Sequence, residues 1–361
     1  MPFTNNEQEI TRQILLKANY DFARNFSLKL DDHEAVFTSD KVVRIIPGKR
    51  LVAFGRWNNQ AVVAKIFFAR QAKQHMQRDL RGAKALTEAK IPAPKVYYQG
   101  DAASRTMQVI IFERIQNAES LEDFWQRQQN SAESEPAMQA LTLELATQHV
   151  MGLLQEDLHL KNFLWSGEKI YSIDGADIKC LREPLSKKTS IENLALLFSQ
   201  LGLHTDKLQQ RLFNTYVRAR NWLIENADIQ LLQKTIQQWN ASRWLNYSKK
   251  IFRSSTQFGC IKKFSFYAIF DRRYFSKQHE HFLENPESFF NHPQLEVLKA
   301  GRSSTVVKVP IGERTFVVKR YNYKGLANAF KGWFKPSRAM SCWRLSHQLK
   351  FSGIPTANPI A

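Results

Sequence analysis

The chain has 361 residues, of which 43% are apolar, and its 52 lysines and arginines against 33 acidic residues give a formal net charge of +19. This apolar content is enough to bury a core, so the composition excludes a globally disordered chain. Residues 1–180 carry a net charge of +1, and residues 181–361 carry +18. The second half therefore predicts contact with an anion, which could be nucleic acid, phospholipid or a phosphorylated substrate.

Neither the cysteines nor the N-terminus indicates export. Cys180, Cys260 and Cys342 lie far apart, which argues against a disulfide scaffold and favours a reducing compartment. The first residues contain no secretory signal pattern, and no apolar run reaches the roughly 20 residues of a membrane span. We expect a cytoplasmic protein that can still bind a membrane surface.

Strands dominate the first part of the chain. Residues 41–68 predict three strands separated by two turns, and a helix follows at about 71–90, where proline ends it. Two further strands, a helix near 136–150, a loop and a short strand at 170–174 come next. After residue 180 the pattern is mostly helical, and strand character returns from about 296.

This return predicts an internal repeat. The repeat has three elements in the same order. In the first copy they are a strand with a lysine, AVVAKIFF, a basic helix, and Leu86 five residues before Ile91-Pro92. In the second copy they are FVVKRYN, a basic helix, and Leu349 five residues before Ile354-Pro355. The second copy keeps Lys319, but residues 314–361 contain no aspartate or glutamate and no catalytic loop follows. Because the sequence ends inside this copy, we expect a fragment or a truncated gene product.

The strongest chemical pattern is Asp157-Leu-His-Leu-Lys-Asn162, followed by Ser172-Ile-Asp174-Gly175. Phosphoryl transfer requires a group that accepts the proton of the attacking hydroxyl, ligands for Mg²⁺ and a cation on the ATP phosphates. Asp157 is the candidate base, and Asn162 and Asp174 are the candidate metal ligands. Local turn or cap formation is the alternative role for an aspartate and an asparagine in a loop.

Lys65 lies towards the end of the strand AVVAKIFF and is the candidate cation for the ATP phosphates. Asp79, on the next helix, is well placed to hold it. The alternatives are a solvated lysine for Lys65 and an exposed helix charge for Asp79. His159 either touches substrate or packs the loop.

These residues resemble the catalytic loop and metal-binding aspartate of protein-kinase-like folds. The stretches GLLQEDLHLKNFL, RIIPGKRLVAFGRW, VVAKIFF and ENLALLFSQL are most similar to the lipopolysaccharide core kinases of the Kdo/WaaP (InaA-like) family. The resemblance implies a bilobal kinase fold, ATP with Mg²⁺, and a sugar hydroxyl of the lipopolysaccharide core as acceptor. It also implies a place at the cytoplasmic face of a Gram-negative inner membrane, where the enzyme is peripheral.

The chain departs from this family at several positions. Gln155 and Glu156 stand where the family usually has His-Gly or His-Arg, and the helix acid is Asp79 rather than glutamate. The turn that would cover the phosphates has a single glycine, so its backbone amides alone cannot cradle the phosphates well. Lys49 and Arg50 are the candidates that compensate for them by charge.

The expected fold class is α+β, a bilobal protein-kinase-like fold followed by a partial second N-lobe. The first expected part is a kinase-like domain over 1–240, with an N-lobe at about 1–115 and a C-lobe at about 116–240. A basic, aromatic-rich helical connector follows over 241–295. The last expected part is an incomplete second N-lobe over 296–361.

Residues 243–277 hold nine basic side chains against one acid, interleaved with aromatic residues. Such a segment is a solvated helical linker, a surface for an anionic membrane or lipopolysaccharide, or a nucleic-acid site. No RRM, KH or zinc-finger pattern accompanies it, so nucleic acid is not among the expected partners. The sequence leaves the oligomeric state open.

The leading hypothesis is a kinase that phosphorylates a heptose or Kdo hydroxyl of the lipopolysaccharide core. A protein Ser/Thr kinase is the alternative within the same enzyme class. A non-catalytic pseudokinase scaffold in envelope biogenesis is the alternative of another class.

Overall fold

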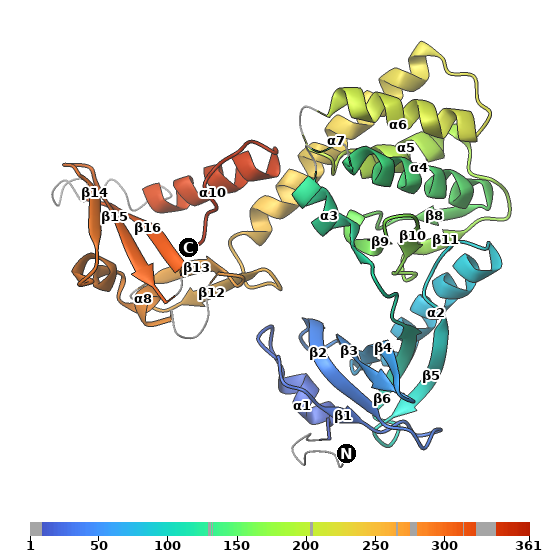
Figure 1. Cartoon of the computed structure of the whole chain (residues 1–361), viewed down its shortest axis with the longest axis horizontal. Helices are drawn as coiled ribbons and strands as arrows, with labels where there is room; N and C mark the ends of the chain where they lie inside the picture. Colours follow the sequence, from blue (N-terminus) through green and yellow to red (C-terminus); the bar gives the residue numbers. More distant parts are fainter. Residues whose placement is uncertain are drawn as a thin grey trace. The chain divides into compact units, whose positions relative to one another are not determined.

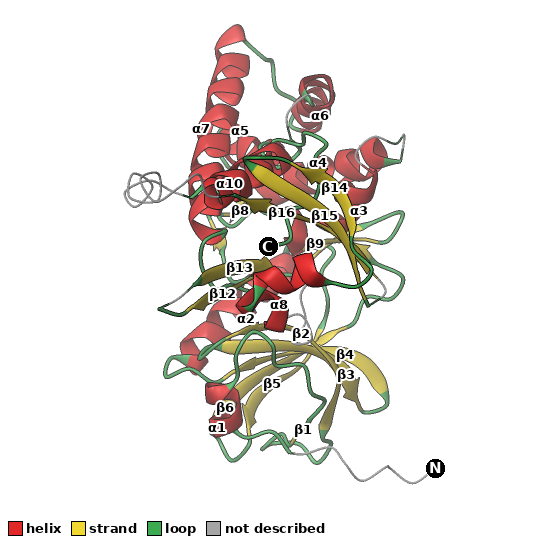
Figure 2. Ribbon diagram, turned by 90° about the vertical axis from the view of Figure 1, so that its left-hand side faces the viewer, coloured by secondary structure: helices red, strands yellow, loops and turns green. Residues whose placement is uncertain are grey.

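The computed structural model describes residues 9–128, 131, 133–202, 205–264, 266–274, 280–312, 314–322 and 337–361. The chain divides into two compact units, Met1–Ala241 and Ser242–Ala361, and each contains both helices and strands (Figures 1 and 2). The predicted α+β class is confirmed. Within the described residues, no helix is long and apolar enough to cross a membrane.

The N-terminal part of the first unit is a six-stranded antiparallel sheet with the strand order β1-β2-β3-β4-β6-β5. Helix α2 lies beside this sheet (Figure 1). The elements are α1 (Arg12–Lys17), β1 (Ser27–Leu28), β2 (Phe37–Ile46), β3 (Arg50–Trp57), β4 (Gln60–Phe67), α2 (Ala72–Glu88), β5 (Val96–Ala102) and β6 (Met107–Glu113).

Alternation along the strands gives the sheet two different faces. Leu51 and Ala53 on β3 pack with Ala64 and Ile66 on β4 in a fully buried core. Their neighbours in sequence, including Lys65, belong to the other face of the sheet. One face of the sheet therefore forms this core, and the other face carries Lys65 beside a smaller apolar cluster of Phe67, Ile110 and Met76 of α2.

The rest of the first unit is mainly helical. Its elements are β7 (Glu119–Ser120), α3 (Leu121–Gln128), α4 (Ser134–Val150), β8 (Leu153–Gln155), η1 (Leu160–Asn162), β9 (Phe163–Trp165), β10 (Ile170–Ser172), β11 (Ile178–Cys180), α5 (Lys187–Phe198), α6 (Asp206–Ala219) and α7 (Asn226–Lys250). Leu141 and Leu145 of α4 pack with Leu194 of α5 and Leu212 of α6 in its core. This core supports the short strands that flank the predicted catalytic loop.

The second unit contains the end of α7 and two small sheets. Its elements are β12 (Phe258–Lys262), β13 (Tyr267–Asp271), α8 (Glu280–Glu284), η3 (Pro286–Asn291), β14 (Glu296–Ala300), β15 (Ser304–Ile311), β16 (Arg314–Tyr321) and α10 (Arg338–Phe351). Trp343 of α10 packs on Ile251 and Phe258, and its indole N–H donates to the carbonyl of Ile251 at 3.0 Å.

The segment 241–295, which the sequence predicts as a helical connector, differs from that prediction. After α7 the chain forms the antiparallel hairpin β12–β13. Residues of high strand propensity, such as Phe258, Ile261 and Ile269, favour a hairpin over a helix there. Residues 265 and 275–279 of this segment, and 323–336 of the predicted basic helix, lie outside the described residues.

Candidate active site

Lys65 lies on β4 and contacts two carboxylates. Its Nζ atom is 3.2 Å from Oδ2 of Asp79 on α2 and 3.4 Å from Oδ1 of Asp174, which follows β10. Lys65 and Asp79 are buried, whereas Asp174 remains partly exposed. The structure thus brings together three of the predicted site residues, and the shorter side chain of Asp79 still reaches the lysine.

The two carboxylates differ in their electrostatic surroundings. Burial raises the pKa of Asp79, and the nearby charge of Lys65 only partly opposes this effect. Burial also disfavours the charged form of Asp174, but Lys65 and Arg50 outweigh it and lower its pKa. Asp174 is therefore the carboxylate that stays ionised and available for a cation.

Helix α2 reaches Lys65 because two glycines let it touch the loop of Asp174. A Cβ atom on Gly82 would lie 1.9 Å from the carbonyl oxygen of Gly175. A Cβ atom on Gly175 would lie 2.7 Å from the backbone nitrogen of Ala83. Only glycine permits so close an approach at these positions, so the glycine pair sets the distance between Asp79 and Asp174.

Arg78 on α2 forms a further contact with the loop that follows Asp174. Its Nε donates to the carbonyl of Ala176 at 2.6 Å, and its guanidinium forms an ion pair with Asp177. Asp177 also lines the pocket of the site. The sequence analysis missed Arg78 and Asp177, and only the proximity of Asp177 to Asp174 in the chain hinted at a role.

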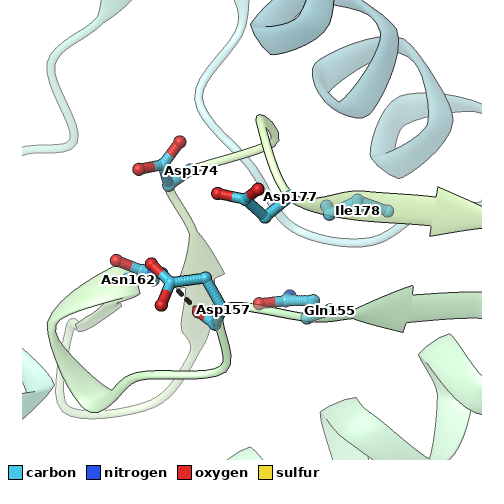
Figure 3. Close-up of a pocket in the computed structure, with 6 residues that line it drawn as sticks. All are labelled: Gln155, Asp157, Asn162, Asp174, Asp177 and Ile178. Atoms are coloured by element: carbon cyan, nitrogen blue, oxygen red, sulfur yellow. Dashed lines mark hydrogen bonds between the residues drawn. The ribbon is translucent and has the colours of Figure 1, made fainter. Parts of the chain in front are cut away.

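The predicted catalytic loop runs from β8 through η1 to β9. Asp157, Asn162 and Asp174 line one pocket, together with Gln155, Asp177 and Ile178 (Figure 3). The amide nitrogen of Asn162 donates to the carbonyl of Asp157 at 2.7 Å, and the backbone N–H of Ile173 donates to the carbonyl of Asn162 at 2.9 Å. These bonds fix the loop against the strand that leads to Asp174.

His159 contacts the carboxylate of Asp157 through one ring nitrogen and the side chain of Gln200 through the other. Nε2 of His159 is 3.1 Å from Oδ1 of Asp157, and Nδ1 is 3.2 Å from Oε1 of Gln200. The hydrogen bond from His159 lowers the pKa of Asp157 to about 2. Gln200 also donates to the carbonyl of Leu158 at 2.7 Å. The structure thus gives His159 a positioning role, and it adds Gln200, which the sequence analysis missed.

A network of buried polar side chains is hydrogen-bonded to the strand that leads into the catalytic loop. The carbonyl of Gln155 accepts from Nδ2 of Asn193 at 2.9 Å, and Oδ1 of Asn193 is 3.0 Å from Nε2 of His149. Nδ1 of His149 is 2.7 Å from the hydroxyl of Tyr216, which accepts from Arg220 at 2.9 Å. Burial lowers the pKa of His149 to about 4, so this histidine is neutral at pH 7. The side chain of Gln155 is buried and its Nε2 donates to Oε1 of Gln148 at 2.8 Å, so the glutamine at this unusual position has a hydrogen-bond partner.

The oxygen atoms of this pocket suit a hard cation. The amide nitrogen of Asn162 is engaged with Asp157, which leaves Oδ1 as its free ligand atom, and Asp174 supplies an ionised carboxylate. Mg²⁺ commonly takes one or two carboxylates and completes its shell with water and phosphate oxygens. The described residues contain no cluster of three His, Cys, Asp or Glu side chains that could hold a metal ion.

The two basic residues predicted to cover the phosphates are placed differently. Arg50 begins β3, and its charge contributes to lowering the pKa of Asp174. Lys49 lies in the turn after Gly48, where its backbone carbonyl accepts from Phe68 at 3.0 Å. Arg50 thus acts on the site through its charge, while Lys49 has an exposed side chain and a backbone role.

Part of the chain matches a known protein family. Residues 56–216 match the model of the lipopolysaccharide kinase (Kdo/WaaP) family. This segment belongs to that family. The Kdo/WaaP proteins are lipopolysaccharide kinases, so both the predicted family and the predicted enzyme class, a phosphotransferase, are confirmed.

The Kdo/WaaP segment contains Lys65, Asp79, Asp157, Asn162 and Asp174, and it ends within α6. A solved structure, WaaP in complex with acyl carrier protein, aligns at 21% identity and a TM-score of 0.42, over 55% of this chain and 87% of that chain. A similarity of this size supports no inference about function. No curated protein matches the chain.

Proposed function

We propose that the chain transfers the γ-phosphoryl group of ATP to a heptose or Kdo hydroxyl of the lipopolysaccharide core. The observation that carries the proposal is the convergence of Asp157, Asn162 and Asp174 on one pocket, with Lys65 held beside them. This convergence occurs inside a segment of the lipopolysaccharide kinase family.

Each residue has one role in this proposal. Asp157 accepts the proton of the attacking hydroxyl, and Lys65, held by Asp79, binds phosphate oxygens. Asn162 and Asp174 would hold Mg²⁺, which when bound supplies charge neutralisation on the phosphates. Arg50 adds a positive charge beside Asp174. Lys49 remains a candidate phosphate contact through its exposed side chain.

Two alternatives are weighed by the same observations. A pseudokinase scaffold has no need for an ionised Asp157 or for a lysine between two carboxylates, so these features favour catalysis. A protein Ser/Thr kinase would use a similar site, but the family match favours a lipopolysaccharide acceptor.

The acceptor is tested by incubating the full chain with radiolabelled ATP, Mg²⁺ and either lipopolysaccharide or a general protein kinase substrate. We expect label on the core sugars and none on the protein. Label on protein alone would support the Ser/Thr kinase. Label on neither, despite Mg²⁺-dependent stabilisation by ATP in a thermal shift assay, would reject both acceptors.

We further infer that the enzyme works peripherally at the cytoplasmic face of the inner membrane. The tip of the hairpin β12–β13 supports this location. The side chain of Phe264 is fully exposed and that of Tyr267 is 43% exposed, beside the basic residues Lys262 and Lys263. Aromatic rings at the headgroup level and lysines on anionic lipid are the usual means of interfacial binding.

Flotation with lipid vesicles tests this location. The full chain is expected to bind vesicles containing phosphatidylglycerol and not vesicles of phosphatidylcholine alone. Phe264→Ser should weaken that binding about 10- to 100-fold, because one buried phenylalanine side chain contributes roughly 1.5–3 kcal/mol. Leu223→Ser is the matched control, since Leu223 is an exposed apolar residue of the first unit. Equal losses in both variants would contradict a specific role of the hairpin.

We also infer that residues 296–361 form a partial second N-lobe, as the repeat predicts. Strands β14, β15 and β16 form an antiparallel sheet in chain order, as β2, β3 and β4 do. Lys319 pairs with Val306 in the second sheet, as Lys65 pairs with Val52 in the first. Both first strands also carry an irregularity at the same place, between Val297 and Lys299 and between Val42 and Arg44.

Helices α2 and α10 end with the same backbone hydrogen bond at their C-termini. The backbone N–H of Ile91 donates to the carbonyl of Leu86 at 2.9 Å, and that of Ile354 donates to Leu349 at 2.9 Å. In the first copy Lys90 has a φ of 57° before this bond, and in the second Gly353 has a φ of 72°. A shared bulge and a shared C-cap support duplication more strongly than sequence similarity alone.

A further inference from the structure

The bulge in β2 changes which residue faces the active site. Val42 pairs with Ala53 and Arg44 pairs with Val52, so Val43 is an extra residue with no partner on β3. A β-bulge of this kind redirects the side chains that follow it, and bulges are common beside active sites.

The pairing across three strands then places Arg44 in the row of Lys65. Arg44 pairs with Val52, and Val52 pairs with Lys65 on β4. Directly paired residues of an antiparallel sheet point to the same face. The flanking residues Leu51 and Ala53 belong to the buried core on the opposite face. Arg44 therefore lies on the face that carries the catalytic lysine.

The charges around Arg44 agree with this placement. Its side chain is open to solvent, yet the surrounding protein and the charge of Arg50 lower its pKa, while the charges of Asp174 and Asp157 raise it. The desolvation is thus partial, and the guanidinium stays accessible to a ligand. The charge of the guanidinium therefore interacts with the charges of Asp174 and Asp157.

Arg44 is also available in a way that Lys65 is not. Lys65 already contacts Asp79 and Asp174, whereas no described acidic residue forms an ion pair with Arg44. The turn beyond β2 contains a single glycine, Gly48, and a proline without an N–H, Pro47, so its backbone can approach phosphate oxygens less closely than a glycine-rich turn would. A triphosphate at this site needs a cation that is not neutralised by the protein.

We propose that Arg44 binds the phosphate chain of the nucleotide and replaces the backbone amides that a glycine-rich turn would supply. Its planar guanidinium can donate two hydrogen bonds to one phosphate. The second sheet has a basic residue, Lys299, at the matching position after its own bulge, which supports a basic residue as a regular part of this strand. The inference rests on the proposed function, because it assumes a nucleotide in this cleft.

The test compares the binding of ATP and of adenosine, in the presence of Mg²⁺, to the full chain and its variants by calorimetry. Arg44→Ala should weaken ATP binding about 10- to 100-fold, the range for loss of a charged hydrogen bond, and leave adenosine binding unchanged. Arg44→Lys should recover only part of the loss. Arg56→Ala is the control, since Arg56 is an exposed arginine about 13 Å further along the sheet.

Several results would overturn the inference. They are unchanged ATP binding in Arg44→Ala, an equal loss of adenosine binding, an equal effect of Arg56→Ala, or a wild-type chain that binds no ATP. A wild-type chain that binds ATP but does not label lipopolysaccharide would reject the proposed acceptor, and the effect of Arg44→Ala on ATP binding would still decide the role of Arg44.

Discussion

Replacing Asp157 with alanine is expected to lower the rate of phosphate transfer to lipopolysaccharide about 10²- to 10⁴-fold, the usual contribution of a positioned general base. The expectation rests on geometry. Asp157 lies in the same pocket as Asn162 and Asp174, and His159 holds its carboxylate in one orientation. In the proposed function Lys65 and Asp174, rather than Asp157, hold the ATP phosphates and their metal ion, so the KM for ATP should change little.

The neighbouring residue provides a matched control. Glu156→Ala removes an exposed carboxylate that forms an ion pair with Lys179 on β11 and takes no part in the pocket. We expect its rate to stay close to that of the wild type. Equal rates for wild type and Asp157→Ala would contradict the assignment of the base. Since the pKa of Asp157 is about 2, it stays ionised above pH 4, and any fall in rate between pH 7 and 5 must have another origin.

Gly82→Ala is expected to abolish most of the activity and to reduce the free energy of unfolding by about 1–3 kcal/mol, as overpacking does. Helix propensity alone predicts the opposite sign, because alanine stabilises a helix interior by roughly 1 kcal/mol relative to glycine. The new Cβ atom would lie 1.9 Å from the carbonyl oxygen of Gly175, a backbone atom. Helix α2 would therefore have to move away from Asp174 and carry Asp79 away from Lys65.

Urea unfolding and the transfer assay measure the two parts of this prediction separately. Gln77→Ala is the control, because Gln77 is exposed on the same helix and a surface change there should stay within about 0.5 kcal/mol. A Gly82→Ala variant that is more stable than the wild type and equally active would show that α2 does not need its close contact with Gly175.

The sequence predicts the parts of the site that lie close together in the chain. The five-residue spacing of Asp157 and Asn162, the aspartate after the next strand and the lysine at the end of a strand all follow a recognisable order. The antiparallel strands of the first lobe also follow from alternation and turn residues, such as Asn58 and Asn59, whose positive φ values suit a tight hairpin.

The missed residues act through contacts between distant segments. Nothing local in the sequence joins Gly82 to Gly175, Arg78 to Asp177 or Gln200 to His159, because each pair meets only after the helical lobe has formed. Arg44 was missed for a different reason. The sequence does not show whether Ile45 or Ile46 faces the core, so only the observed pairing with Val52 assigns Arg44 to the face of Lys65.

The contact between α2 and the loop of Asp174 bears on how such an enzyme is controlled. Many kinases are turned off when the corresponding helix swings outward and breaks the lysine–acid pair. Here the glycine backbones touch, and Arg78 fastens the outer edge of the same contact. Helix α2 is therefore tied to the loop of Asp174 by backbone contact and by Arg78, in addition to the Lys65–Asp79 pair. An outward movement of α2 would have to break these contacts together with the Lys65–Asp79 pair, so this fold disfavours control by such a movement.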